Sequence, residues 1–269
     1  MKKPVLSFQS RFGPWALVAG ASKGLGAEYA HQLAAKGLNL VLVARHEIRL
    51  QTLAEELGAR YSIQVRKIVC DLSLPDAASQ IANQTGDLEI GLLTYNAAVA
   101  PVAPFFEVSQ EQHLSAIDTN VRTPLAMVYL IGQPMRARHR GGIILMSSLS
   151  AMQGSALLSN YAATKAYNLV LAEGLWDELR QDGIDVLVCL PASIATPNYL
   201  VDLPEGKKSP TQALSPQQVA SETLAALGKQ SVIIPGWTNR IASFVLRHLF
   251  PRQSAVRLMG RVLRGMYNR

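Results

Sequence analysis

The chain has 269 residues, of which 49% are hydrophobic and 17% are charged. These proportions are typical of a folded globular protein and exclude a disordered or fibrous chain. No secretory signal peptide and no membrane-spanning segment is expected, because the N-terminal region lacks a long apolar run and no later window of about 18 residues is apolar throughout. Cys70 and Cys189 each end an apolar segment, which predicts free buried thiols and a cytoplasmic location.

The net charge of +7 is unevenly distributed along the chain. Residues 223–269 contain eight lysines and arginines and no aspartate or glutamate, so the rest of the chain is close to neutral. The basic character therefore belongs to the C-terminal segment. The arginines there are not interleaved with aromatic residues that could stack on bases, so nucleic-acid binding is not expected.

The first predicted elements are a short buried strand, a glycine-rich turn and a helix. The strand covers residues 15–19, and the turn has the spacing Gly20-x-x-x-Gly24-x-Gly26. Gly20 allows a tight turn, Gly24 allows the backbone to approach a phosphate, and Gly26 allows the helix to pack against the sheet. The N-terminus of the helix offers N–H groups to a pyrophosphate. This arrangement predicts a dinucleotide-binding site.

The second buried strand, residues 38–45, ends in a cation where many dinucleotide folds have a carboxylate. That carboxylate would bind the ribose 2′-hydroxyl of NAD(H). Here Arg45 ends the strand, and Lys23 lies within the glycine turn. Two cations at this place favour the 2′-phosphate of NADP(H). The alternative interpretation is that both side chains are simply solvated at the surface.

A helix is predicted at residues 46–58 and a third strand at 64–70, which is followed by Asp71 and Leu72. Ser73 and Pro75 are expected to open the next helix. Asp71 could cap that helix, accept a hydrogen bond from the adenine amino group, or do both.

A fourth strand, at residues 90–94, is followed by Asn96 and Ala97. Small residues just after a strand allow a ribose to pass closely. The next predicted helix, at about 109–131, contains Asn120 in its middle, although asparagine is unfavourable there. Asn120 is therefore expected either to hold a water molecule or to distort the helix.

The next strand and helix carry the residues that suggest chemistry. The strand at 143–148 ends in Ser148, and a helix is predicted at 161–180. Tyr161 and Lys165 are four residues apart, so they share a helix face. An ammonium beside a phenol lowers the pKa of the tyrosine, which would suit it to general acid–base catalysis. Taken alone, a Tyr-x-x-x-Lys pair is weak support, because such pairs also occur by chance.

A strand at 185–190 ends at Pro191, and the loop after it can supply backbone groups to a nicotinamide carboxamide and a hydroxyl from Thr196. Residues 198–213 are polar and unpatterned, which favours a lid over a substrate. The remaining core elements are a helix and a strand, at 215–227 and 231–235. Alternation of strands and helices in this rhythm predicts a parallel, doubly wound α/β sheet.

Over residues 14–236 the chain resembles the short-chain dehydrogenase/reductase family. The resemblance rests on motifs in the family's order and spacing, namely Gly20-x-x-x-Gly24-x-Gly26, Asp71, Asn96-Ala97-Ala98, Asn120, Ser148, Tyr161-x-x-x-Lys165 and Pro191 to Thr196. It implies a single-domain Rossmann fold with a seven-stranded sheet over 1–236, and a C-terminal extension at 237–269 that belongs to the same structural unit. It also implies hydride transfer between NAD(P)(H) and a carbonyl or secondary alcohol.

The resemblance further implies a role for each matching residue. Tyr161 would be the acid–base and Ser148 would polarise the substrate oxygen. Lys165 would lower the tyrosine pKa and bind the nicotinamide ribose, and Asn120 would hold a water of the proton relay. The implied cofactor-binding residues are Gly20, Ser22, Lys23, Gly24, Leu25, Gly26, Arg45, Asp71, Leu72, Asn96, Ala97, Tyr161, Lys165, Pro191, Ile194 and Thr196.

No metal site is predicted, and family members commonly assemble as dimers or tetramers through the helices of Asn120 and Tyr161. Three residues depart from the family pattern: Ala19, Ala98 and Ala192 replace the usual threonine and glycines. They affect fine cofactor geometry rather than the reaction class. The substrate is expected to be a small ketone or alcohol; the apolar stripes of the tail are compatible with an apolar one, but no residue identifies it.

The segment 239–266 carries two apolar stripes separated by Pro251, with arginines along the polar sides. It predicts a pair of basic amphipathic helices. One interpretation places them on an anionic membrane surface, and the other docks them on the body of the protein or on a second subunit. The second is favoured. For the whole protein, the alternative to an enzyme is a catalytically silent NADP(H)-binding scaffold or redox sensor, although the complete Asn–Ser–Tyr–Lys set argues against it.

Overall fold

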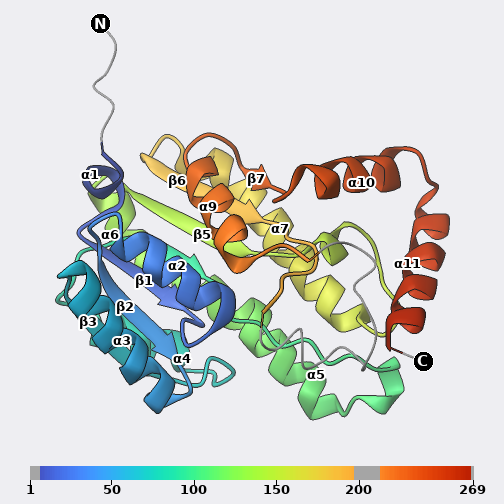
Figure 1. Ribbon diagram of the computed structural model, residues 1–269, viewed down its shortest axis with the longest axis horizontal. Coiled ribbons are helices and arrows are strands. Elements are labelled where there is room, and N and C mark those ends of the chain that lie inside the picture. The colour runs from blue at the N-terminus through green and yellow to red at the C-terminus, as the bar shows by residue number, and fades with distance from the viewer. Residues whose placement is uncertain (1–6, 197–212, 268–269) are drawn as a thin grey trace, which may run out of the picture.

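Figure 1 shows the computed structural model of the chain, which describes residues 7–196 and 213–267. The described residues form a seven-stranded sheet with the order β3-β2-β1-β4-β5-β6-β7, in which all neighbouring strands run parallel. The strands are β1 (Trp15–Ala19), β2 (Asn39–Ala44), β3 (Val65–Val69), β4 (Ile90–Tyr95), β5 (Gly141–Met146), β6 (Ile184–Cys189) and β7 (Val232–Ile233). The predicted parallel, doubly wound α/β sheet is confirmed.

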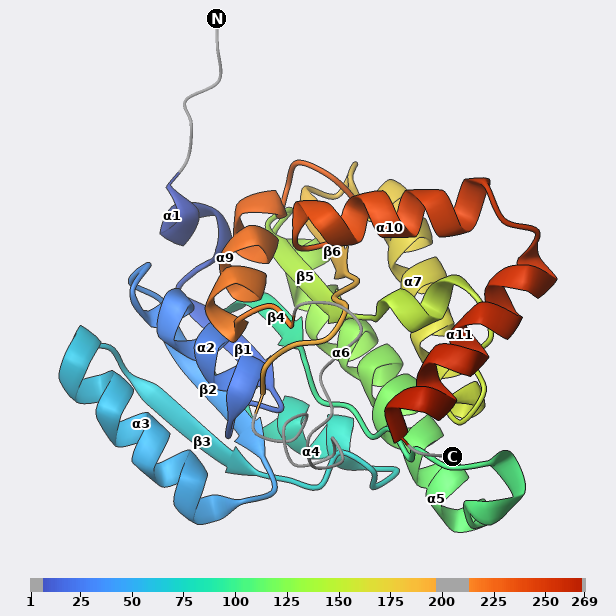
Figure 2. The same ribbon diagram turned by 45° about the vertical axis from the view of Figure 1, so that its right-hand side comes forward.

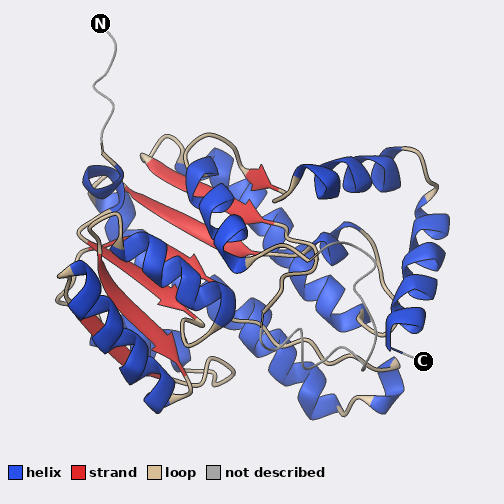
Figure 3. Ribbon diagram, in the orientation of Figure 1, coloured by secondary structure: helices blue, strands red, loops and turns tan. Residues whose placement is uncertain are grey.

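Helices cover both faces of the sheet (Figure 3). One face packs against α2 (Gly24–Ala34), α3 (Glu47–Tyr61) and α9 (Pro216–Ala226), and the other against α4 (Ala77–Gln84), α6 (Thr123–Ala137) and α7 (Ser159–Leu179). A separate cluster of buried apolar side chains lies on each face. In β1, Ala16 and Val18 belong to the first cluster, while Leu17 and Ala19 belong to the second. Burial on both sides explains why the strands read as continuous apolar runs.

The strand order reverses beside β1, whose neighbours are β2 and β4. In open α/β sheets, the crevice at such a switch point, outside the carboxyl ends of the strands, is where ligands bind. The register places Ala19, at the end of β1, opposite Val43 of β2 and Tyr95 of β4. The loops that follow these strand ends contain most of the predicted cofactor residues, so the topology gathers them at one edge of the sheet.

The helix expected at 109–131 runs from Gln110 to Ala137 and is distorted in its middle, as one of the two expectations for Asn120 predicted. It is divided into α5 (Gln110–Ile117), a π-helical turn η2 (Asp118–Arg122) and α6. A π turn changes the pairing of nearby helix carbonyls. Here the carbonyl of Thr119 accepts from the Tyr95 hydroxyl at 2.6 Å, and that of Asn120 accepts from Asn168 Nδ2 at 2.9 Å. The helix is therefore distorted at the residue that the sequence marked as unusual.

Three other boundaries differ from the prediction. The helix α4 begins at Ala77, beyond Ser73 and Pro75, because consecutive turns closed by Leu74 N–H to Asp71 O and Ala77 N–H to Leu74 O precede it. The helix α7 begins at Ser159, before Tyr161, and β7 is shorter than the predicted 231–235. The predicted lid at 198–213 lies outside the described residues except for its last position.

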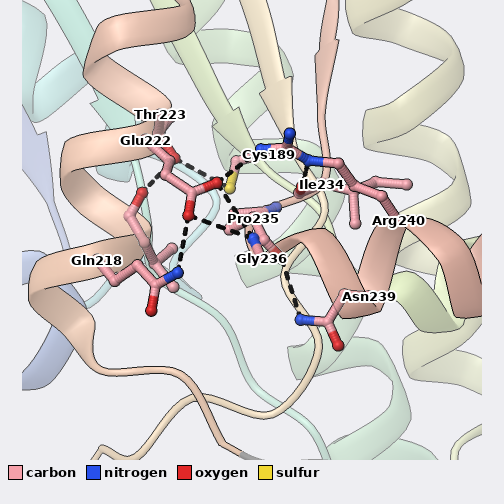
Figure 4. A network of polar contacts seen from close by, with 10 residues as sticks. Cys189, Gln218, Glu222, Thr223, Ile234, Pro235, Gly236, Asn239 and Arg240 are labelled. Carbon is pink, nitrogen blue, oxygen red and sulfur yellow. Dashed lines mark hydrogen bonds and ion pairs between the residues drawn. The ribbon is translucent and has the colours of Figure 1, made fainter.

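After β7 the chain forms α10 (Trp237–His248) and α11 (Arg252–Tyr267). Figure 4 shows how the start of α10 is attached to the body of the protein. The carboxylate of Glu222, on α9, accepts from the Gly236 N–H at 3.1 Å and from Arg240 Nη2 at 2.7 Å. Asn239 Nδ2 donates to the Pro235 carbonyl at 3.0 Å. These bonds connect the first turn of α10 to both α9 and the end of β7.

The two C-terminal helices differ in how much of their surface is buried. The helix α11 buries Ala255, Gly260 and Leu263. Along α10, all of which is described, Asn239 is the one fully buried residue. On the opposite side of α10, Trp237 and Phe244 are 71% and 59% exposed. Within the described ranges, no helix has the length and apolar character needed to cross a membrane.

Candidate active site

The glycine turn between β1 and α2 holds three backbone segments close together. Gly20 has a φ of +82°, and a Cβ added there would lie 2.7 Å from the Ala97 nitrogen. A Cβ added to Gly26 would lie 1.9 Å from the Gly20 carbonyl oxygen and 2.8 Å from Asn96 Nδ2. Asn96 Nδ2 also donates to the Gly20 carbonyl at 3.1 Å. Only glycine fits at these two positions, so the β1 and β4 loops can meet beside the start of α2.

The start of α2 has the chemistry of an anion site. The residue before the helix is Lys23, whose side chain has no acceptor and so cannot cap the helix as a serine or aspartate would. The first-turn N–H groups therefore remain available to an anionic ligand, and the positive end of the helix dipole favours one. Ser22, Lys23 and Gly24 are partly exposed at this turn. These features fit the diphosphate of a dinucleotide cofactor.

Leu25 and Leu72, two of the predicted cofactor residues, have buried side chains. Leu25 belongs to the core cluster beneath α2, so only its backbone N–H can face a phosphate. The backbone carbonyl of Leu72 accepts from the Thr123 hydroxyl at 2.8 Å. Leu25 and Leu72 can therefore contact a cofactor only through backbone groups or through the edge of the side chain.

Arg45 and Asp71 lie beside each other after β2 and β3. The side chain of Arg45 is 61% exposed, and its Nη1 is 3.9 Å from Asp71 Oδ2. Asp71 Oδ1 accepts from the backbone N–H and the hydroxyl of Ser73, at 3.0 and 2.8 Å. Partial burial alone would raise the pKa of Asp71, but the Ser73 hydrogen bonds and the Arg45 charge outweigh it and lower the pKa. Asp71 thus caps a turn through one oxygen, and its predicted adenine contact would have to use the other.

The predicted catalytic residues come together from β5 and α7. Ser148 follows β5, and its hydroxyl hydrogen-bonds with the phenol of Tyr161. The buried Lys165 ammonium donates to the Met146 carbonyl at 2.8 Å and lies 5.6 Å from the centre of the Tyr161 ring. The Ser147 hydroxyl donates to the Lys165 carbonyl at 2.7 Å, which ties α7 to the end of the strand. The three predicted side chains therefore form one cluster.

The pKa values in this cluster differ from the sequence-based prediction. Burial raises the pKa of Tyr161 to about 12; the Ser148 hydrogen bond opposes this shift, and the nearby Tyr267 adds to it. Burial lowers the pKa of Lys165 to about 8. The expectation that Lys165 lowers the tyrosine pKa is therefore not met in this structure, because desolvation dominates and the ammonium is directed to the Met146 carbonyl.

Asn120 is fully buried and connects the β4 loop to α7. Its Oδ1 accepts from the Val99 N–H at 2.9 Å, and its Nδ2 donates to the Val99 carbonyl and to Thr164 Oγ1 at 2.8 and 3.0 Å. The backbone carbonyl of Asn120 accepts a hydrogen bond from Asn168 Nδ2. Asn120 thus positions the loop next to the catalytic helix, and its implied role in holding a water stays a prediction.

The loop after β6 lies on the other side of the catalytic cluster. The Pro191 carbonyl accepts from the Leu149 N–H at 3.0 Å, directly after Ser148. Ile194 pairs with Leu214, and the Thr196 N–H donates to the Ile194 carbonyl at 2.7 Å. The loop is therefore ordered by backbone bonds up to the last described residue before the gap, which leaves its predicted nicotinamide contacts untested.

A shallow groove of about 700 Å³ lies between the β4 loop and α5. It is lined by Val99 to Pro101 on one side and by Ser109, Glu111, Gln112 and Ser115 on the other. The amide of Asn160, next to Tyr161, donates to the His113 carbonyl of α5 at 3.0 Å. This bond joins the helix that lines the groove to the catalytic helix.

Sequence reasoning missed three residues of this region. Tyr95 and Asn168 satisfy the carbonyls of the π turn, and Tyr267 acts electrostatically on Tyr161. Polar residues at otherwise apolar positions were a usable signal for the first two. Tyr267 gave no such signal, because it lies over one hundred residues from Tyr161 in a tail that the family motifs do not cover.

The chain matches the family model described as short chain dehydrogenase over residues 14–201. It is 30% identical to a 7beta-hydroxysteroid dehydrogenase from Mediterraneibacter gnavus, over 95% of this chain and 98% of the relative. A solved 7beta-hydroxysteroid dehydrogenase structure is 28% identical and superposes with a TM-score of 0.90, covering 94% of this chain and 99% of that one.

A short-chain dehydrogenase from Sphingobium yanoikuyae, solved in complex with NADPH, superposes with a TM-score of 0.79 at 28% identity, covering 90% of this chain and 94% of that one. The family model alone spans well over half of the chain. Together with the glycine turn and the Ser148–Tyr161–Lys165 cluster, these similarities show that the chain belongs to the short-chain dehydrogenase family of oxidoreductases.

Proposed function

We propose that the protein is an NADP(H)-dependent reductase of bulky, largely apolar ketones, with hydroxysteroids and their keto forms as the leading substrate class. The observation that carries this proposal is the cluster of Ser148, Tyr161 and Lys165 at the same sheet edge as the glycine turn. It combines a proton donor, a hydrogen-bond donor and a buried cation next to a dinucleotide site. The similar proteins named 7beta-hydroxysteroid dehydrogenases support the substrate class.

In the reductive direction, the chain's own residues move a proton and hold the substrate oxygen. The phenol of Tyr161, whose pKa of about 12 keeps it protonated at neutral pH, donates its proton to the carbonyl oxygen. The hydroxyl of Ser148 hydrogen-bonds the same oxygen and stabilises the negative charge that develops there. Lys165 supplies a positive charge 5.6 Å from the centre of the tyrosine ring. The bound nicotinamide supplies the hydride.

A preference for NADP(H) over NAD(H) rests on Lys23 and Arg45. No carboxylate ends β2, and the guanidinium of Arg45 is 61% exposed and pairs with Asp71 only at 3.9 Å. A guanidinium in this position can bind a phosphate with charge-assisted hydrogen bonds. Replacement of Arg45 by alanine should weaken NADPH binding about tenfold or more and leave NADH binding nearly unchanged.

A homo-oligomer formed through α6 and α7 is part of the proposal. Leu125 and Tyr129 on α6 are 42% and 66% exposed, and Tyr167 and Val170 on α7 are 38% and 66% exposed. Exposed apolar side chains gathered on adjacent helices are typical of an interface. Contact with an anionic membrane stays a separate prediction, and α10, with Trp237 and Phe244 exposed, offers the larger apolar side chains for it.

The test of the enzymatic proposal is the Tyr161→Phe variant, assayed with NADPH and a steroid ketone. It should lose at least about a hundredfold in kcat and retain wild-type NADPH affinity, because only the transferred proton is removed. Leu258→Ala, at an exposed position far along the chain, is the control and should retain full activity. Unchanged turnover of Tyr161→Phe would refute the mechanism. NADPH binding by a wild-type protein that reduces no ketone would favour the silent scaffold.

A further inference from the structure

The last helix, α11, packs on the loop that joins the two catalytic elements. A Cβ added to Gly260 would lie 3.4 Å from the Cβ of Ala156, which is in the segment between Ser148 and Tyr161. Leu263, one turn further along α11, is buried. The arginines of this helix, Arg257, Arg261 and Arg264, are exposed on the other side. The orientation of α11 is thus set, with its small and apolar residues against the catalytic loop.

Tyr267 lies on this inner side of α11. It follows Gly260 by seven residues, or almost two full turns, so the two residues share a face and are about 10 Å apart along the axis. The Tyr267 side chain is partly buried, and its charge state influences Tyr161 directly. In Figures 1 and 2, α11 runs along the side of the molecule that carries α7, and the last turn of α11 lies toward α5. The end of α11 therefore reaches the catalytic cluster.

Two contacts support the position of α11. At the start of the preceding helix α10, the Glu222 carboxylate accepts from Gly236 and Arg240 (Figure 4). In the middle of α11, Gly260 packs close to Ala156 of the catalytic loop. A substrate carbonyl bound to Ser148 and Tyr161 must project the rest of its molecule away from the sheet, where these helices lie.

We infer that Tyr267 is a specificity-determining residue, which contacts the part of a bulky apolar ketone that extends beyond its reacting carbonyl. The inference rests on the proposed reductase function and adds α11 to the substrate site. The phenol of Tyr267 presents an apolar ring to the substrate and a hydroxyl that can reach a second polar group. A small ketone would not extend to the last turn of α11, so its reduction does not depend on Tyr267.

The first test compares two ketones of different size, a steroid ketone and cyclohexanone, at saturating NADPH. Tyr267→Ala should raise KM for the steroid ketone about tenfold or more, because a large apolar contact is lost, and should leave cyclohexanone reduction and NADPH affinity unchanged. Leu258→Ala, on the exposed side of the same helix, is the matched control and should change neither reaction. Equal losses for both ketones, or no loss for either, would overturn the inference.

The second test does not depend on activity and separates failure of this inference from failure of the proposed function. Titration of tyrosines labelled with ¹³C at Cζ, with Tyr161→Phe used to assign the signal, measures the pKa of Tyr161 in the cofactor-free protein. In Tyr267→Phe this pKa should be lower than in the wild type, because the neighbouring phenolate is removed. If the wild type reduces neither ketone, the proposed function fails, and the titration alone then tests whether Tyr267 lies near Tyr161. An unchanged Tyr161 pKa in Tyr267→Phe would refute that placement.

Discussion

Substitution of Gly26 by alanine should damage both stability and cofactor binding, although it adds a single methyl group. The added Cβ would lie 1.9 Å from the Gly20 carbonyl oxygen and 2.8 Å from Asn96 Nδ2. Neither the oxygen nor the carbonyl carbon can move without shifting the β1–α2 turn. Overpacking of this kind costs about 1–3 kcal/mol. Because the displaced turn is also the phosphate site, NADPH affinity should fall about tenfold or more, each tenfold step being about 1.4 kcal/mol.

The assay is thermal denaturation with and without NADPH, together with calorimetric titration of NADPH. For a chain of this size, each kcal/mol should lower Tm by about 2–4 °C, so a fall of about 2–12 °C is expected for Gly26→Ala. The matched control is Gly58→Ala in α3, where the nearest atom to an added Cβ is at 3.7 Å. It should stabilise the protein by about 0.5–1 kcal/mol, because alanine favours a helix more than glycine does. Wild-type Tm and NADPH affinity in Gly26→Ala would refute the reasoning.

Three further predictions follow from burial and exposure. Lys165→Met should abolish reductase activity. It should also raise the free energy of unfolding by about 1–3 kcal/mol at pH 7, because the folded protein holds a buried ammonium whose pKa is about 8. This gain in stability should shrink as the pH rises from about 8 to about 10.5, where lysine in the unfolded chain also loses its proton. Val170→Glu, on the exposed side of α7, should dissociate the proposed oligomer, as measured by light scattering, whereas an unchanged mass would remove this helix from the interface. If α10 binds anionic vesicles, the double variant Trp237→Ser and Phe244→Ser should abolish their flotation with the protein; absence of flotation by the wild type would end the membrane prediction.

The elements that local pattern determines were predictable from the sequence. Continuous apolar runs such as residues 15–19 mark strands buried on both faces, and the glycine spacing from Gly20 to Gly26 marks the turn that follows. The π turn at Asn120 was visible in the sequence only as a residue that is unfavourable in a helix, because the contacts that accompany it are long-range. Tyr95 and Asn168 donate hydrogen bonds to carbonyls of the turn, in place of backbone N–H groups of the helix. Tyr267 raises the pKa of Tyr161 from a helix whose position depends on long-range contacts, such as those of Glu222 with Arg240 and of Gly260 with Ala156, and not on a local motif.

The pKa of Tyr161 is a second property that the local sequence pattern did not predict. Helical spacing places Tyr161 and Lys165 on one face, and sequence reasoning then expects a lowered tyrosine pKa. In the structure, the ammonium of Lys165 donates to the Met146 carbonyl, and burial raises the pKa of Tyr161 to about 12.

The two views predict opposite results for a tyrosine titration of the cofactor-free protein. A raised pKa means that the Tyr161 phenol stays protonated through pH 10 and is ready to donate a proton, as reduction of a carbonyl requires. Lys165→Met should then change this pKa little, because desolvation is the larger cause. Titration of Tyr161 near neutral pH, shifted upward by Lys165→Met, would show instead that the lysine charge controls the tyrosine. In that case the base needed for alcohol oxidation would already be present at neutral pH.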